Sequence, residues 1–85
     1  MIHKIFPFEY EISEDGKEYS EKVTSLEEAI KKMSDGKFLT AKYDIQFDNR
    51  TAIQQKEILD FAEIAHLNQQ EIVERIEQKI ADKFN

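Results

Sequence analysis

Residues 6–23 read FPFEYEISEDGKEYSEKV, and this stretch decides the expected fold. Apolar side chains alternate with polar ones up to Ile12, which is the period of a strand with one buried face. Asp15-Gly16 then supplies the dipeptide that a tight two-residue turn prefers. We therefore predict a β-hairpin with its apolar side chains on one inner face. If the two strands pair symmetrically about this turn, three cross-strand pairs lie on the inner face: Phe8 with Val23, Tyr10 with Glu21, and Ile12 with Tyr19.

The next segment predicts a helix and a third strand. Ser25 and Glu28 have the spacing of a capping box, and an apolar stripe follows them at helical spacing. Gly36 is a natural stop for this helix. Residues 38–47 alternate apolar and polar side chains again, which indicates the third strand.

The C-terminal third of the chain is predicted to be helical. Residues 51–66 contain no helix breaker, and their apolar positions cover much of a helix circumference. A last helix is expected from a cap at Asn68 to about Lys83. The order ββαβαα predicts an α+β fold, a single domain over residues 1–85. Its three-stranded sheet places strand three antiparallel beside strand one, with the helices on one face.

Proline limits how far that sheet can extend. Pro7 has no N–H to donate to a neighbouring strand. We therefore expect strand three to stop pairing with strand one near Pro7. An aromatic group is interpreted as core and not as a base-stacking platform, because its flanks are acidic. Its members are Phe6, Phe8, Tyr10, Tyr19, Tyr43 and Phe47.

Charge and composition exclude several functions. The chain carries a net charge of −6, and residues 1–28 hold eight acidic against three basic side chains. Such a balance predicts no direct binding to nucleic acid or to anionic membranes. The chain has no Cys, which excludes thiolate catalysis and Cys-ligated zinc. With no apolar stretch long enough to span a bilayer, we expect a soluble cytoplasmic protein.

Acidic side chains cluster around the predicted hairpin. Carboxylates two residues apart on a strand lie about 6.6 Å apart, close to the spacing of successive phosphates. They could therefore dock on a basic surface of a partner protein, one that normally holds nucleic acid. The alternative is a charged strand face that keeps the protein soluble. The candidate partner-binding residues are Glu9, Glu11, Glu14, Asp15 and Glu18.

A helix-turn-helix in residues 58–77 is the runner-up. Small and apolar residues fall at suitable positions, but His66 replaces the usual turn glycine and Arg75 occupies a core position. The exposed side of the second helix is rich in Gln and Glu, and phosphates would repel those carboxylates. A helical hairpin that fills the core explains the same pattern, and residues 51–66 offer a surface for a homodimer.

Catalytic chemistry has little support in the sequence. Glu63 and His66 form a single E-x-x-H spacing, whereas carboxylate-bridged metal sites need two such motifs and further carboxylates. Neither a Ser-His-Asp set nor a phosphate loop can be assembled, and no cofactor is predicted. We therefore expect a small acidic, non-enzymatic protein-binding module, such as an inhibitor or accessory factor of the kind that mobile genetic elements carry.

Overall fold

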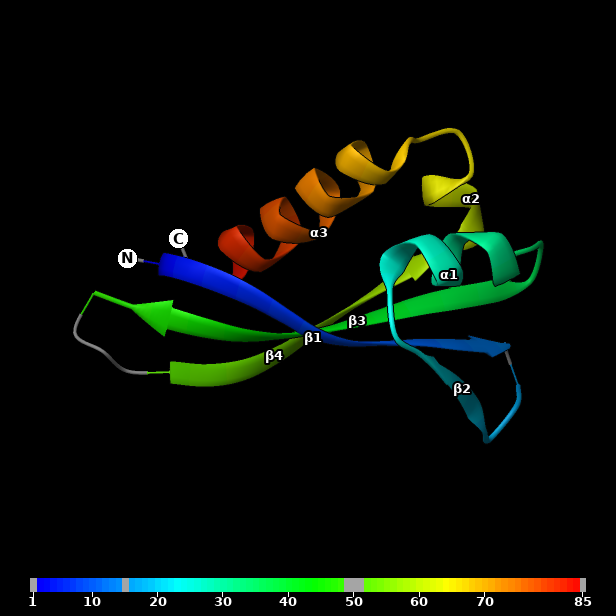
Figure 1. Cartoon of the computed structure of the whole chain (residues 1–85), viewed down its shortest axis with the longest axis horizontal. Helices are drawn as coiled ribbons and strands as arrows, with labels where there is room; N and C mark the ends of the chain where they lie inside the picture. Colours follow the sequence, from blue (N-terminus) through cyan, green and yellow to red (C-terminus); the bar gives the residue numbers. More distant parts are fainter. Residues whose placement is uncertain (1, 15, 49–51, 85) are drawn as a thin grey trace.

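A twisted antiparallel sheet forms the base of the molecule, and helices cover one of its sides (Figure 1). The computed structural model describes residues 2–14, 16–48 and 52–84. The sheet has four strands in the order β2-β1-β3-β4, so the predicted count of three is wrong. The predicted α+β class, with helices on one face, is confirmed. The elements are β1 (Ile2–Glu14), β2 (Ser20–Val23), α1 (Leu26–Lys32), β3 (Lys37–Phe47), β4 (Ala52–Asp60), α2 (Phe61–Ile64) and α3 (Gln69–Phe84).

The hairpin of β1 and β2 is present, but its pairing differs from the prediction. The Lys17 N–H donates to the Glu14 carbonyl oxygen at 3.1 Å, the hydrogen bond of a tight turn. Gly16 has a φ of +77°, whereas Asp15 lies outside the described residues, so the predicted turn type is not assigned. Residues 17–19 stay outside the ladder, which shifts the register by two. Tyr10 therefore faces Val23 and Ile12 faces Glu21, so all three predicted inner pairs are wrong.

Pro7 changes the direction of the side chains along β1. β3 pairs with β1 on both sides of Pro7, so the expectation that pairing stops there is wrong. Instead, the register shifts between Pro7 and Glu9, as at a β-bulge. This shift reverses the alternation: Tyr10 and Ile12 are buried as predicted, but Phe6 and Phe8 are exposed. The bulge thus places two phenylalanines on the side away from the helices.

Residues 52–60, predicted as helix, form strand β4 instead. β4 pairs antiparallel with β3, placing Leu59 opposite Leu39 and Ile53 opposite Ile45. Within the described part of the predicted segment, residues 52–66, only Phe61–Ile64 is helical, as α2. The strand alternation is concealed in the sequence, because Glu57 lies on the buried side while Ile58 lies on the exposed one. The helix expected to carry a homodimer surface is therefore replaced by β4 over residues 52–60.

α1 and α3 lie where the sequence predicts helices, although α1 ends at Lys32, before the stop predicted at Gly36. Ser25 accepts a hydrogen bond from the Glu28 N–H at 3.2 Å, whereas the Glu28 carboxylate accepts from Thr24, so the predicted capping box is only half formed. At α3, Asn68 and Glu71 exchange both bonds of a capping box, at 2.9 and 3.1 Å. Strand three lies antiparallel beside strand one, as predicted. Between sheet and helices lies a core whose fully buried members include Leu39, Tyr43, Ile45, Leu59, Ile72, Ile76 and Ile80.

Candidate functional site

One face of the sheet is left uncovered by the helices of the described residues, and we call it the open face (Figure 1). Three large apolar side chains are exposed on it: Phe6 at 40%, Phe8 at 49% and Ile58 at 52%. Exposed apolar groups gathered on one surface are typical of a binding site. From the strand registers and the lining of the hollow beside Phe8, the open face comprises Lys4, Phe6, Phe8, Glu9, Glu11 and Ser13 of β1, Ser20 and Lys22 of β2, Phe38, Thr40, Lys42, Asp44 and Gln46 of β3, and Ala52, Gln54, Lys56, Ile58 and Asp60 of β4.

An ion-pair cluster crosses three strands of the open face. The Lys42 ammonium lies 2.7 Å from a Glu9 oxygen and 3.0 Å from a Glu11 oxygen. Lys22 faces Glu11 across the hairpin, and its ammonium lies 3.5 Å from Glu9. The hydrogen bond from Lys42 lowers the pKa of Glu9, and the bonds to Glu9 and Glu11 raise the pKa of Lys42. Two of the predicted partner-binding carboxylates are thus already matched by lysines of the same chain.

The five predicted site residues do not form one row. Glu9 and Glu11 lie together on the open face. Glu14 alternates to the opposite side at the end of β1, where its carboxylate lies 3.6 Å from the Lys37 ammonium. Glu18 is exposed in the connection between β1 and β2, and Asp15 lies outside the described residues. The structure therefore divides the predicted acidic surface. Glu9 and Glu11 form ion pairs on the open face, whereas Glu14 and Glu18 lie near the end of the hairpin.

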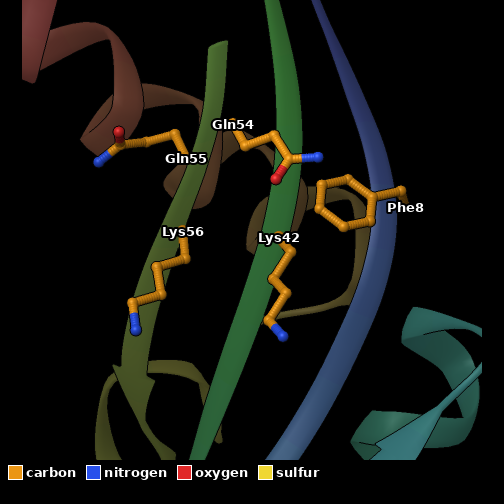
Figure 2. A pocket seen from close by; sticks show the side chains of 5 residues that line it. All are labelled: Phe8, Lys42, Gln54, Gln55 and Lys56. Carbon is orange, nitrogen blue, oxygen red and sulfur yellow. The ribbon is translucent and has the colours of Figure 1, made fainter.

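A hollow of about 480 Å³ lies beside Phe8 (Figure 2). Phe8 reaches it from β1, Lys42 from β3, and Gln54 and Lys56 from β4; Gln55 completes the lining from the strand's other side. The Phe8 ring and the Gln54 amide point toward one another across β3. The hollow is shallow and open, which suits an inserted side chain better than an enclosed small molecule.

Sequence reasoning missed the exposed aromatic side chains. Strict alternation assigned Phe6 and Phe8 to the core, and this interpretation is wrong because the register shift after Pro7 turns both outward. Pro7 itself was the available signal, since prolines inside sheets accompany bulges. The ammonium of Lys4 lies 4.7 Å from the centre of the Phe6 ring, a cation–π contact at the margin of the open face.

Three carboxylates and one phenol of the described residues have pKa values shifted by their surroundings. Hydrogen bonds and nearby lysines lower the pKa of Glu9, Glu28 and Glu63, and burial raises the pKa of the Tyr43 phenol. Each of these shifts moves the pKa away from neutral pH, whereas a general acid or base needs a pKa near it. No group of three or more potential metal ligands occurs within residues 2–14, 16–48 and 52–84.

Residues 58–77, which have the spacing of a helix-turn-helix, are built differently from that motif. Residues 58–60 belong to β4, and α2 is four residues long. Glu63 completes the capping box of α2, and its carboxylate lies 3.1 Å from the Lys79 ammonium. Glu63 therefore ties α2 to α3, while His66 is exposed in the turn between them.

Comparison with protein-family models, curated proteins and solved structures finds no match to this chain. Among the described helices, none is both long enough and apolar enough to cross a membrane. A function must therefore be inferred from the geometry and chemistry of the surface.

Proposed function

We propose that this protein is a small non-enzymatic module that binds another protein through its open face. The observation that carries the proposal is the exposure of Phe6, Phe8 and Ile58 together on that face. Aromatic side chains dominate the binding energy of protein interfaces when a partner removes them from water. The hollow beside Phe8 gives the surface the relief that side chains of a partner need.

The carboxylates at the hairpin end have a different role in this proposal. Glu14 lies at the end of β1 and Glu18 in the β1–β2 connection, so both are away from Phe6 and Phe8. Charges at the rim of an interface act mainly on the association rate. They would attract a partner with a basic surface and align it before the apolar groups make contact. Glu18, exposed in the β1–β2 connection, contributes most to this attraction. Glu9, Glu11 and Glu14 contribute less, because Lys22, Lys42 and Lys37 lie beside their carboxylates.

Affinity capture from the native host cell tests the proposal. The tagged chain is compared with a Phe6→Ser/Phe8→Ser variant and with Tyr19→Ser, a matched control that removes an aromatic side chain 73% exposed in the β1–β2 connection. We expect the double variant to lose the captured protein, with affinity weakened at least about tenfold, and the control to retain it. Retention of the partner by the double variant would contradict the proposal.

The association rate distinguishes the attraction exerted by the carboxylates from the contacts made by the apolar side chains. Glu14→Gln/Glu18→Gln should slow association with the captured protein and flatten its salt dependence between about 50 and 500 mM. Its dissociation rate should stay close to that of the unchanged chain. If the association rate of the unchanged chain does not depend on salt, the partner does not have the basic surface proposed here.

Single-stranded nucleic acid is the other class of ligand that exposed phenylalanines on a sheet could bind. Lys4 and Lys56 favour it, because both are basic groups of the open face. The net charge of −6 and the carboxylates of Glu9, Glu11 and Asp44 oppose it. We expect no binding of a labelled oligonucleotide by fluorescence anisotropy at low salt.

A further inference from the structure

We infer that the open face binds a second copy of this chain, so that two sheets pack face to face about a two-fold axis. The inference rests on the proposed function, because it names the partner of the same surface. Three properties of the open face support it: its charge balance, its area and its relief.

The charge of the open face differs from that of the chain. Its side chains include four basic residues (Lys4, Lys22, Lys42, Lys56) and four acidic ones (Glu9, Glu11, Asp44, Asp60). The chain as a whole carries −6, so its negative charge lies on the other surfaces. Two copies of an acidic protein repel one another wherever these other surfaces meet. The open face is the surface on which two copies can meet without that repulsion.

Ion pairing within one copy strengthens this argument. Lys42 is bound to Glu9 and Glu11 of its own chain, so these groups need no charged partner from outside. A two-fold contact brings the same surface of both copies together and must therefore be complementary to itself. A strongly basic or acidic face could not satisfy that condition. A face with internally matched charges around apolar side chains can.

The area of the open face is close to what a stable dimer needs. Strands of 13, 4, 11 and 9 residues, about 4.8 Å apart and rising about 3.3 Å per residue, present roughly 590 Å² of flat area. Side chains make the accessible area larger than the flat area. Specific interfaces bury about 800 Å² on each partner. Sheets packed in this way lie about 10 Å apart with their strands inclined by about 30°.

The relief of the open face provides both a projection and a recess. Phe8 projects from the bulge of β1, and the hollow of about 480 Å³ lies directly beside its ring. In a two-fold contact, an aromatic ring of each copy can enter the hollow of the other. This arrangement would bury the exposed apolar groups of both copies and leave the helices of each on the outside.

Sedimentation equilibrium over a wide range of protein concentrations tests the inference. We expect the unchanged chain to dimerise and Phe8→Glu to be monomeric, because the variant loses the apolar ring that would fill the hollow of the other copy. Tyr19→Glu is the matched control and should dimerise, since Tyr19 lies in the β1–β2 connection. If Phe8→Glu fails to fold by circular dichroism, Ile58→Glu replaces it. A dimer that survives folded Phe8→Glu or Ile58→Glu overturns the inference.

Salt dependence distinguishes a second copy from a basic partner. Screening reduces repulsion between two acidic chains, so the dimer should be as strong or stronger at about 500 mM salt as at about 50 mM. A complex with a basic protein weakens over the same range. Because the chain has no Cys, the single substitutions Thr40→Cys and Gln78→Cys each introduce one site for a spin label. Labels at Thr40 on the open face should lie closer together across the dimer than labels at Gln78 on α3.

The outcomes separate this inference from the proposed function. A chain that is monomeric at every concentration overturns the inference. If that monomer still captures another protein through Phe6 and Phe8, the proposed function stands and its partner is a different chain. If it captures nothing, both fail. A dimer in which labels at Gln78 lie closer together than labels at Thr40 also overturns the inference.

Discussion

The two faces of the sheet are built from the same strands but have opposite surroundings. On the helix-covered face, Leu39, Ile45 and Leu59 are fully buried beneath α3 and its neighbours. On the open face, Phe6, Phe8 and Ile58 are 40–52% exposed. Apolar residues therefore occupy both faces, but only one face has helices to cover them. The comparison shows that hydrophobicity alone does not distinguish a residue of the core from a residue of a binding surface.

Leu59 and Ile58 give the sharpest test of this difference, because they are neighbours on opposite faces of β4. Leu59→Ala removes a fully buried side chain and should lower the free energy of unfolding by about 2–5 kcal/mol. Ile58→Ala should lower it by less than about 1 kcal/mol, since no partner covers this side chain in the monomer. Urea unfolding at a protein concentration low enough to keep the chain monomeric measures both. Equal losses would contradict the assignment of the two faces.

Lys42 and Lys56 lie opposite each other on β3 and β4, and substitutions at these two lysines allow a second comparison. Lys42→Met leaves Glu9 and Glu11 without their main partner and should lower stability, by less than the loss from Leu59→Ala. Lys56→Met should leave stability unchanged or raise it slightly, because Lys56 lies opposite another lysine. NMR titration of Glu9 supplies a second measurement, in which its pKa rises in Lys42→Met and stays lowered in Lys56→Met. An unchanged Glu9 titration in Lys42→Met would exclude the ion-pair cluster from the solution structure.

Acid titration gives the smallest expected effect and concerns the helix-covered side. The hydrogen bond from the Asp60 N–H and the nearby Lys79 lower the pKa of Glu63. Since the folded pKa lies below the unfolded one, this contribution to stability is complete above the unfolded pKa and is lost as the pH falls through the folded one. Unfolding measured between about pH 5 and pH 2 should therefore show a flatter slope for Glu63→Gln than for the unchanged chain. Identical slopes would mean that Glu63 has the same pKa folded and unfolded.

Local signals in the sequence predicted several elements correctly. The Asp-Gly dipeptide predicted the reversal between β1 and β2, and the alternation in residues 38–47 predicted β3. Asn68 and Glu71 mark the start of α3 through the capping box that they form. Each of these signals acts within a few residues. A local rule can therefore detect them without knowledge of the rest of the chain.

β4 could not be recognised in this way. Its buried side includes Gln55 and Glu57, polar residues that conceal the period of two. Glu57 can be buried because the Lys83 ammonium, contributed by α3, lies 2.6 Å from its carboxylate. Leu59 is buried because β3 places Leu39 beside it and the helices cover both. These partners are distant in sequence, so they decide between strand and helix only when the whole chain has folded.

The candidate site depended on tertiary structure even more strongly. The acidic character of the hairpin was visible in the sequence, but its partial neutralisation required Lys42, which β3 brings beside Glu9 and Glu11. The exposure of Phe6 and Phe8 required the register shift after Pro7.

The sequence by itself thus determined the α+β class, the hairpin, the third strand and the last helix, because turns, caps and periodicity act over short distances. The tertiary structure alone decided the fourth strand, the exposed aromatic side chains and the pairing of the carboxylates. Each of these depends on contacts between segments that are far apart in the chain.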